Sequence, residues 1–204
     1  MAKQFPVNNA VFSIAFSELQ SNVIAFGTGD GFFRLHDFST TQDAPLVNLR
    51  LSTKEINSIC CNHFIPSLFL VSGKEAKLWL VDSATQKIDV ISQGEHFDSV
   101  SKVLWHPRQK NLLSSASNDG RVIFYDLLSR GKKSLFDIRD SRNVLSIDYN
   151  KYNELFVTGS VDSSIKLYDL RNPVKPLFVF RGHRYGVSRV KFSPLDQNLL
   201  ASGS

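Results

Sequence analysis

A short pattern of apolar and polar positions recurs five times along the chain. Each copy reads apolar, two residues, apolar, one residue, an aromatic residue or Cys, and then a polar residue. The copies begin at positions 11, 56, 100, 144 and 187, so successive copies are 45, 44, 44 and 43 residues apart. A spacing this regular predicts a repeat architecture, in which one small structural unit is built several times.

The residues after each copy predict three further short strands. A second apolar run ends in small residues at 23–28, 68–73, 112–117, 155–160 and 199–204. In three repeats a turn with Asp follows, at 29–31, 118–120 and 161–163, and Asp and Gly tolerate the positive φ of a tight hairpin. A third strand is predicted to end in the pairs His36-Asp37, Trp79-Leu80, Tyr125-Asp126 and Tyr168-Asp169, and a fourth follows, as at 88–91 and 177–180. No stretch keeps a helical period, so each repeat is predicted to be an antiparallel four-stranded sheet.

This repeat resembles the WD-repeat β-propeller family. Gly182-His183 matches the Gly-His element of the family, and Gly94-Glu95-His96 is a looser match. The resemblance implies an all-β fold with four complete blades and half of a fifth. It implies one propeller domain over residues 1–204, with repeats at 8–51, 52–94, 95–139, 140–182 and 183–204. We expect a C-terminally incomplete ring that exposes Leu199-Leu200-Ala201, because propellers close their ring to hide sheet edges.

In the family, such a His pairs with the turn Asp, a small hydroxyl and a Trp. The resemblance implies a partial version here from His96, Asp119 and Tyr125, which stands in the Trp position. The fourth repeat has Asp140 in place of the His, and the second has Lys74-Glu75 in place of the turn Asp, so both networks are expected to be incomplete. A position that recurs in each repeat has an architectural role, so we interpret these residues as structural rather than catalytic.

Composition narrows the class of protein. The 204 residues are 42% hydrophobic and 21% charged, which excludes a disordered or collagen-like polymer. No run approaches the roughly 18 apolar residues of a membrane-spanning helix, and the first residues lead into no signal-peptide core, so no direct membrane insertion is expected. Cys60 and Cys61 are adjacent and would point to opposite faces of a strand. This arrangement excludes a disulfide framework and indicates a reducing compartment.

The net charge of +5 raises the question of a nucleic-acid partner. The basic residues are spread along the chain, and the densest cluster, Arg130-Gly131-Lys132-Lys133, lies between two apolar runs. We interpret that cluster as a solvated loop and predict no nucleic-acid partner. A histone or nucleic-acid scaffold is a weaker interpretation that only the charge supports.

Organised catalytic chemistry is not apparent in the sequence. The chain has no G-x-S-x-G elbow, no phosphate loop and no Cys/His arrangement with zinc spacing. His63 follows Cys60 and Cys61 closely, and we interpret this proximity as coincidence rather than a metal site. The sequence therefore predicts a protein that is not an enzyme and has no cofactor or metal.

A propeller offers loop-bearing faces for binding. The residues that flank the first apolar residue of each innermost strand should point toward one face. These pairs are Ala10/Phe12, Glu55/Asn57, Ser99/Ser101, Asn143/Leu145 and Gly186/Ser188, with Asn118 and Val161 before the turn Asp. In the WD-repeat family such positions often contact partners. The resemblance thus implies partner contacts by Phe12, Glu55, Asn57, Asp98, Ser99, Ser101, Asn118, Asn143, Leu145 and Tyr185.

Two kinds of contact are expected on this face. The carboxylates of Glu55 and Asp98 would meet a basic group of a ligand, and Phe12, Leu145 and Tyr185 would supply apolar contact. The alternative for each residue is a solvated loop end.

The C-terminal third is similar to the peroxin-7 family, the receptors for the type-2 peroxisomal targeting signal. The similarity rests most on Lys151-Tyr152-Asn153-Glu154 and on Arg189-Val190-Lys191-Phe192-Ser193-Pro194. It implies an import receptor that binds the N-terminal signal of peroxisomal matrix proteins, an amphipathic helix with a basic residue. It also implies an import co-receptor, docking proteins at the peroxisome, and a receptor that is cytoplasmic and cycles to the peroxisome.

Residues 155–171 support a different class of function. Small residues, a turn Asp, an apolar-basic-apolar strand and Tyr168-Asp169-Leu170-Arg171 resemble the motif of substrate adaptors for cullin-based ubiquitin ligases. Arg171 would then contact the ligase linker, although an Arg that packs against the blade corner is the simpler interpretation. A generic protein-interaction scaffold is the third alternative.

Overall fold

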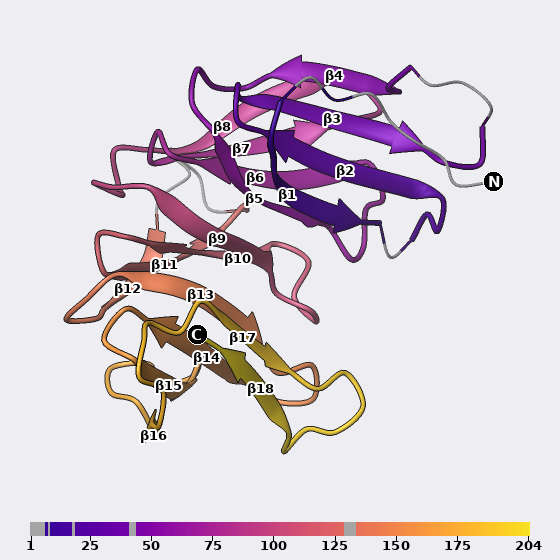
Figure 1. Cartoon of the computed structure of the whole chain (residues 1–204). Coiled ribbons are helices and arrows are strands. Elements are labelled where there is room, and N and C mark those ends of the chain that lie inside the picture. Colours follow the sequence, from indigo (N-terminus) through magenta and orange to yellow (C-terminus); the bar gives the residue numbers. More distant parts are fainter. Residues whose placement is uncertain (1–6, 8, 18, 41–43, 129–133) are drawn as a thin grey trace.

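The computed structural model describes residues 7, 9–17, 19–40, 44–128 and 134–204. Over these residues the protein is built of antiparallel β-sheets, four with four strands each and one with two. The sheets follow one another along the chain, from the indigo N-terminal sheet to the yellow C-terminal pair (Figure 1). The expected all-β propeller of four blades and half of a fifth is therefore confirmed.

Each blade pairs its strands in chain order. Blade 1 contains β1 (Val11–Phe16), β2 (Val23–Thr28), β3 (Phe32–Asp37) and β4 (Val47–Arg50). Blade 2 contains β5 (Ile56–Cys61), β6 (Leu68–Gly73), β7 (Lys77–Asp82) and β8 (Lys87–Gln93). Blade 3 contains β9 (Val100–Trp105), β10 (Leu112–Ser117), β11 (Arg121–Asp126) and β12 (Ser134–Arg139). Blade 4 contains β13 (Val144–Tyr149), β14 (Leu155–Ser160), β15 (Ser164–Asp169) and β16 (Phe178–Arg181), and β17 (Arg189–Phe192) and β18 (Leu200–Gly203) follow.

The first strands of successive blades lie next to one another, so β1, β5, β9, β13 and β17 form the inner wall of the stack (Figure 1). Side chains on these strands bond the backbone of the next blade. The hydroxyl of Ser58 accepts the N–H of Val103 at 3.3 Å, and that of Ser146 accepts the N–H of Val190 at 3.2 Å. The five copies of the apolar template are thus the five inner strands.

The hydrophobic core lies between blades rather than within them. Phe33 of blade 1 packs against Phe69 of blade 2, with ring centroids 5.3 Å apart. Trp105 lies in the cluster between blades 2 and 3, and Phe124 and Phe156 meet edge to face between blades 3 and 4. A single sheet has no partner for its second face, so each blade buries its apolar side chains only when its neighbours stack on it.

The turns between the second and third strands have the expected left-handed backbone. Gly31 and Gly120 both have φ of 82°, Ser163 has 66°, and Ala76 takes the same place in blade 2 with 57°. At Gly31 a Cβ would come within 2.1 Å of the carbonyl oxygen of Ser52, so this position requires Gly for space as well as for φ.

The third strand of blade 2 corrects one prediction. The pair Trp79-Leu80 was expected to end this strand, but β7 continues to Asp82. Val81 pairs with Phe69 as Tyr125 pairs with Leu113 in blade 3, so Val81 holds the place of the aromatic residue. Trp79 lies two residues earlier on the same side of the strand and is buried in the core between blades 1 and 2.

Two further expectations concern the surface. Within the described ranges, β18 pairs with β17, and Leu199 and Ala201 are exposed, as expected for the segment at 199–201. The predicted basic loop Arg130-Gly131-Lys132-Lys133 lies outside the described residues. Among the described residues, no helix has the length and hydrophobicity needed to cross a membrane.

Candidate protein-interaction face

The starts of the inner strands and the turns between second and third strands meet at one end of the blades. We call this end the strand-start face, made by residues 9–12, 29–31, 54–57, 74–76, 95–101, 117–120, 142–145, 161–163 and 184–188. In every blade a turn N–H donates to the carbonyl just before the inner strand: Gly29 to Ala10, Lys74 to Glu55, Asn118 to Ser99 and Val161 to Asn143, at 2.9–3.1 Å. The repeat therefore builds a continuous rim of fixed loops.

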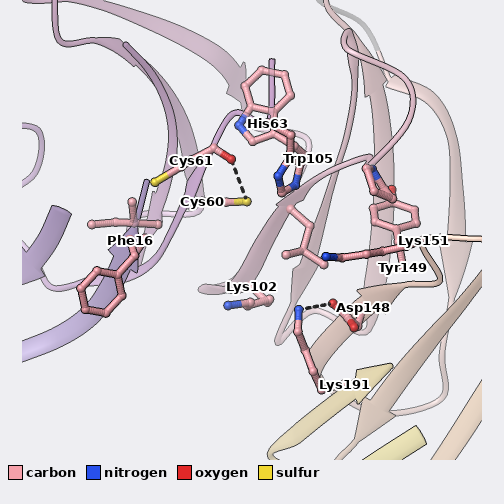
Figure 2. A pocket seen from close by; sticks show the side chains of 14 residues that line it. Phe16, Cys60, Cys61, His63, Lys102, Trp105, Asp148, Tyr149, Lys151 and Lys191 are labelled. Carbon is pink, nitrogen blue, oxygen red and sulfur yellow. Dashed lines mark hydrogen bonds and ion pairs between the residues drawn. The ribbon is translucent and has the colours of Figure 1, made fainter. Parts of the chain in front are cut away.

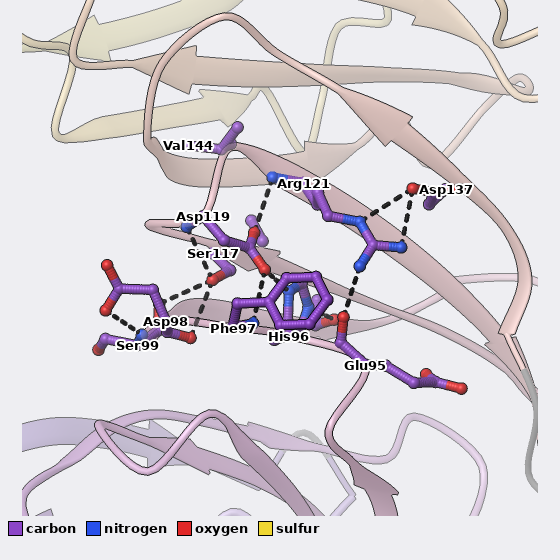
Figure 3. Close-up of polar contacts among 12 residues, drawn as sticks. Glu95, His96, Phe97, Asp98, Ser99, Ser117, Asp119, Arg121, Asp137 and Val144 are labelled. Carbon is purple, nitrogen blue, oxygen red and sulfur yellow. Dashed lines mark hydrogen bonds and ion pairs between the residues drawn. The ribbon is translucent and has the colours of Figure 1, made fainter.

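The predicted His–Asp pair holds this rim in blade 3 (Figure 3). The Nδ1 of His96 lies 2.8 Å from the Oδ2 of Asp119, and its Nε2 lies 2.7 Å from the hydroxyl of Ser115. The His96 side chain is fully buried. Tyr125 is buried beside this group, and its hydroxyl donates to Ser92 at 3.3 Å. The partial network expected from the resemblance is thus formed, and it ties the loop before β9 to the turn after β10.

Hydrogen bonds keep Asp119 ionised. Burial by itself raises the pKa of Asp119, but the bonds from the His96 ring and from the N–H groups of Phe97 and Arg121 outweigh it and lower the pKa to about 2. A carboxylate with a depressed pKa adds stability above its ordinary pKa of 3.8. This contribution is lost as the pH falls from there toward 2.

As expected, the His–Asp network of blade 2 lacks its turn Asp, and another tie takes its place. Glu75 accepts hydrogen bonds from the Ser52 hydroxyl at 2.7 Å and from the Thr53 N–H at 3.0 Å. The bond from Ser52 is the main cause that lowers the pKa of Glu75 to about 2, with Thr53 and Lys77 adding to it. A longer acidic side chain therefore reaches the incoming loop directly.

Blade 4 shows a third version of the same tie. The Nζ of Lys166 lies 2.5 Å from Asp140 in the incoming loop and 3.3 Å from Asp162 in the turn. Lys166 is a strand residue that bridges two carboxylates where a His would bridge a hydroxyl and one carboxylate. As expected, the His–Asp network of blade 4 lacks its His, and the ion pairs of Lys166 with Asp140 and Asp162 take its place.

The structure brings the predicted partner-binding residues to this face but leaves only some of them available. Asn57 donates from Nδ2 to the Ser99 hydroxyl at 2.7 Å, and the Ser101 hydroxyl donates to the Val144 carbonyl at 2.6 Å. These three side chains join neighbouring blades. Glu55 forms a surface ion pair with Lys74 at 2.8 Å.

The remaining predicted residues differ in exposure. The side chains of Phe12 and Tyr185 are exposed by 54% and 76%, and Asp98 is exposed as well. Asn118, Asn143 and Leu145 are half-buried. Exposure therefore favours Phe12, Asp98 and Tyr185 as the residues with side-chain surface free for a partner.

Phe97 is a candidate that the sequence reasoning missed. Its ring is 80% exposed, yet its N–H donates to Asp119 at 3.0 Å and the guanidinium of Arg121 lies 5.7 Å from the ring centroid. Arg121 is itself held by Asp137, with an Nη2–Oδ2 distance of 2.9 Å (Figure 3). An exposed aromatic ring on a fixed loop is typical of a contact residue at a protein interface. The sequence feature that could have identified Phe97 is its place as an apolar residue directly after the His of the Gly94-Glu95-His96 segment.

Comparison with known families identifies the repeat. The family model described as WD domain, G-beta repeat, matches residues 89–126, 133–169 and 174–204, more than half of the chain. The chain belongs to the WD-repeat family. Residues 11–82 lie outside the matched segments, but blades 1 and 2 have the same strand order and the same turn-to-strand bonds as the WD-repeat blades that follow.

Relatives with different printed names are similar over nearly the whole chain. The Histone acetyltransferase type B subunit 2 of Candida glabrata is 24% identical over 212 residues, covering all of this chain and 50% of the relative. The Peroxisomal targeting signal 2 receptor of Schizosaccharomyces pombe is 26% identical over 208 residues, covering all of this chain and 66% of the relative. The E3 ubiquitin-protein ligase COP1 of Arabidopsis thaliana is 28% identical over 203 residues, covering 96% of this chain and 29% of the relative.

The chain thus spans between about a third and two thirds of the length of these relatives. WD-repeat proteins mediate protein–protein interaction, and this general role is what the family membership supports. Within the described residues, no group of three or more His, Cys, Asp or Glu side chains is placed to hold a metal ion.

Arg171 lies at the opposite end of blade 4, after the end of β15. Its Nη2 contacts the Oδ2 of Asp169 at 2.5 Å and its Nε lies 2.9 Å from Oδ1. The bond from Arg171 lowers the pKa of Asp169 to about 2. The guanidinium therefore forms a bidentate pair at the blade corner.

The polar residue that ends each template caps the turn after the inner strand. Asn62 and Asn150 accept backbone N–H bonds through their side-chain oxygens, and the Nδ1 of His106 accepts those of Arg108 and Gln109 at 3.2 and 3.0 Å. Burial lowers the pKa of His106 to about 4. His106 must be neutral at Nδ1 to accept these bonds.

We expect His106 to make folding sensitive to mild acid. Its pKa is 6.5 when unfolded and about 4 when folded, so the unfolded chain takes up a proton first as the pH falls. The contribution of the neutral His106 to the free energy of unfolding is fully present above pH 6.5, and it declines by about 3 kcal/mol as the pH falls toward 4. Urea denaturation at pH 7.5, 5.5 and 4 will measure this loss. The variant His106→Asn, which copies Asn62 and Asn150, should lose less stability over that range, and parallel curves for both proteins would contradict the assignment.

Proposed function

We propose that this WD-repeat chain is a receptor for the type-2 peroxisomal targeting signal and binds that signal on the strand-start face. The peroxisomal receptor of fission yeast, similar over the whole chain, supports this choice among WD-repeat functions. The proposal implies cargo among peroxisomal matrix proteins, a co-receptor and docking proteins at the peroxisome. It also implies a cytoplasmic protein that cycles to the peroxisome.

The observation that carries the proposal is the neighbouring pair Phe97 and Asp98. The Phe97 ring is exposed on a loop that Asp119 and Arg121 hold in place, and Asp98 presents an exposed carboxylate beside it. The Oδ1 of Asp98 accepts the N–H of Ser99 at 2.6 Å, and its Oδ2 has no hydrogen bond to any residue that the structure describes. An amphipathic helix with apolar residues and a basic residue would find both of its contacts here.

Binding of a fluorescent type-2 signal peptide tests the proposal. We expect Asp98→Lys to weaken binding by about tenfold or more, because it replaces attraction with repulsion at a charge-assisted contact. The matched control Asp98→Asn keeps the bond to the Ser99 N–H and removes only the charge, so its effect isolates electrostatics. Glu55→Lys should have a smaller effect, because Lys74 already pairs with Glu55.

Two outcomes would contradict the proposal in different ways. Unchanged binding after both charge reversals would remove Glu55 and Asp98 from the site. A chain that fails to bind the signal peptide both alone and with the import co-receptor would contradict the receptor function itself.

The adaptor function at Arg171 has the weaker geometric support. Its guanidinium is engaged by both oxygens of Asp169, so a ligase linker would have to compete with this pair. A pull-down that recovers ligase linker from the unchanged chain but not from Arg171→Ala, and recovers no matrix enzyme, would favour the adaptor.

A further inference from the structure

A pocket of about 220 Å³ lies along the inner strands, toward their far ends from the strand-start face (Figure 2). Its wall includes residues from β1, β5, β9 and β13, together with Lys191 of β17. Four basic side chains line it: His63, Lys102, Lys151 and Lys191. Among the described residues of its wall, Asp148 is the one carboxylate.

That carboxylate is already engaged. Its Oδ1 lies 2.8 Å from the Nζ of Lys191, and its Oδ2 accepts the backbone N–H of Phe192 at 2.8 Å. Within the described ranges, Lys102 and Lys151 have no carboxylate oxygen within 4 Å of Nζ. Two ammonium groups therefore face one pocket without a direct counter-ion.

Lys102 departs from the repeat at a position with a structural task. Ser58 and Ser146 stand at the same place in β5 and β13, where their hydroxyls accept an N–H from the next inner strand. In β9 this place holds Lys102, and blade 3 is tied to blade 4 by Ser101 instead. A Ser at this position would bond the next inner strand as Ser58 and Ser146 do. Because Lys102 does not make this bond, we infer that it has a different role.

The surroundings of Lys102 are unfavourable for a charge. It is half-buried, and burial is the main cause that lowers its pKa. Repulsion from Arg189 and Lys191 acts in the same direction, while Cys60 and Asp148 act against it. An anion in the pocket would supply the counter-charge that Lys102 and Lys151 lack among the described residues.

We propose that this pocket binds a small phosphorylated anion free in solution, held by Lys102, Lys151 and Lys191. Lys binds phosphate as a point charge with three donors, whereas planar carboxylates favour the fork of an Arg. The described part of the pocket wall contains Lys but no Arg. A water molecule occupies about 30 Å³ in the liquid, so a pocket of about 220 Å³ holds the volume of several waters. This volume is enough for a diphosphate. This site is independent of the peptide-binding function, because it lies away from the strand-start face.

Calorimetric titration of the full chain with pyrophosphate tests the site, with Trp fluorescence as a second readout. We expect saturable binding that Lys102→Ser and Lys151→Ala each weaken by about tenfold. Lys102→Ser restores the residue found at this place in β5 and β13, so its thermal stability should equal or exceed that of the unchanged chain. Lys175→Met removes one exposed positive charge outside the pocket and should leave binding unchanged.

Three results of the titration would overturn the proposal. They are the absence of saturable binding, a Lys102→Ser variant that binds as tightly as the unchanged chain, and an equal loss in Lys175→Met. Vesicles that contain phosphatidic acid test the other source of a phosphate group. Vesicle binding that pyrophosphate does not displace and Lys102→Ser does not weaken would assign the basic groups to a lipid surface and would also overturn it.

Discussion

Replacing Asp119 with Ala is expected to lower the free energy of unfolding by about 3 kcal/mol. The substitution leaves the fully buried ring of His96 without its carboxylate at 2.8 Å and removes the acceptor for the Phe97 N–H. Buried polar groups that lose a partner keep their full cost of desolvation. Denaturation in urea at pH 7 measures the loss.

The control is an acidic residue on the surface. Asp89 pairs with Lys87 at 3.4 Å, and both side chains are well exposed, so Asp89→Ala should change stability by less than about 1 kcal/mol. Asp119→Asn keeps an oxygen acceptor and should fall between the two. If Asp119→Ala were no more damaging than Asp89→Ala, the network of blade 3 would have no structural role.

The second large effect is expected from Phe156→Ala, at about 3–5 kcal/mol. Phe156 is fully buried between blades 3 and 4, where its ring stacks on Tyr168 with centroids 5.1 Å apart and meets Phe124 edge to face at 5.2 Å. Removing the ring opens a cavity between two sheets, and rigid strands on both sides limit how far it can close.

Phe178→Ala is the matched control within the same blade. Phe178 lies on the outer strand β16 and is 62% exposed, so its truncation should cost less than about 1 kcal/mol. Guanidinium denaturation followed by tyrosine fluorescence and circular dichroism compares the two variants. A small effect for Phe156→Ala would mean that blades 3 and 4 do not depend on this contact for stability.

The sequence predicts the architecture well because the same physical demand recurs in each repeat. The template at Ile56 or Val144 becomes an inner strand every time, because alternate side chains must enter the cores on either side. The turn at 118–120 is predictable for a similar reason, since a tight hairpin needs a residue with positive φ, here Gly120.

Other features depend on contacts that no local pattern reveals. The residue type of Trp79 suggests the end of a strand, but the pairing of β7 with β6 sets the register. Trp79 pairs with Val71 and Val81 pairs with Phe69, so the strand continues beyond Trp79. Lys166 replaces a His by reaching across two loops, and a single sequence does not show how far a flexible side chain will reach.

The candidate face was predictable in position more than in detail. The residues before each inner strand do meet there, yet Asn57 and Ser101 are used between blades, which only the neighbouring strand reveals. Phe97 lies in a loop, where hydrophobic periodicity gives no information.

The placement of each core between two blades has a consequence for how such a chain can grow. Each blade contributes side chains to two cores, one on each of its faces. In β6, Phe69 enters the core between blades 1 and 2, and Leu70 enters the core between blades 2 and 3. A duplicated sequence repeat therefore supplies one side of each of two cores and does not supply one complete core. An added repeat fits only where its two sides match two different neighbours, which favours tandem copies of similar size over insertions from unrelated sources.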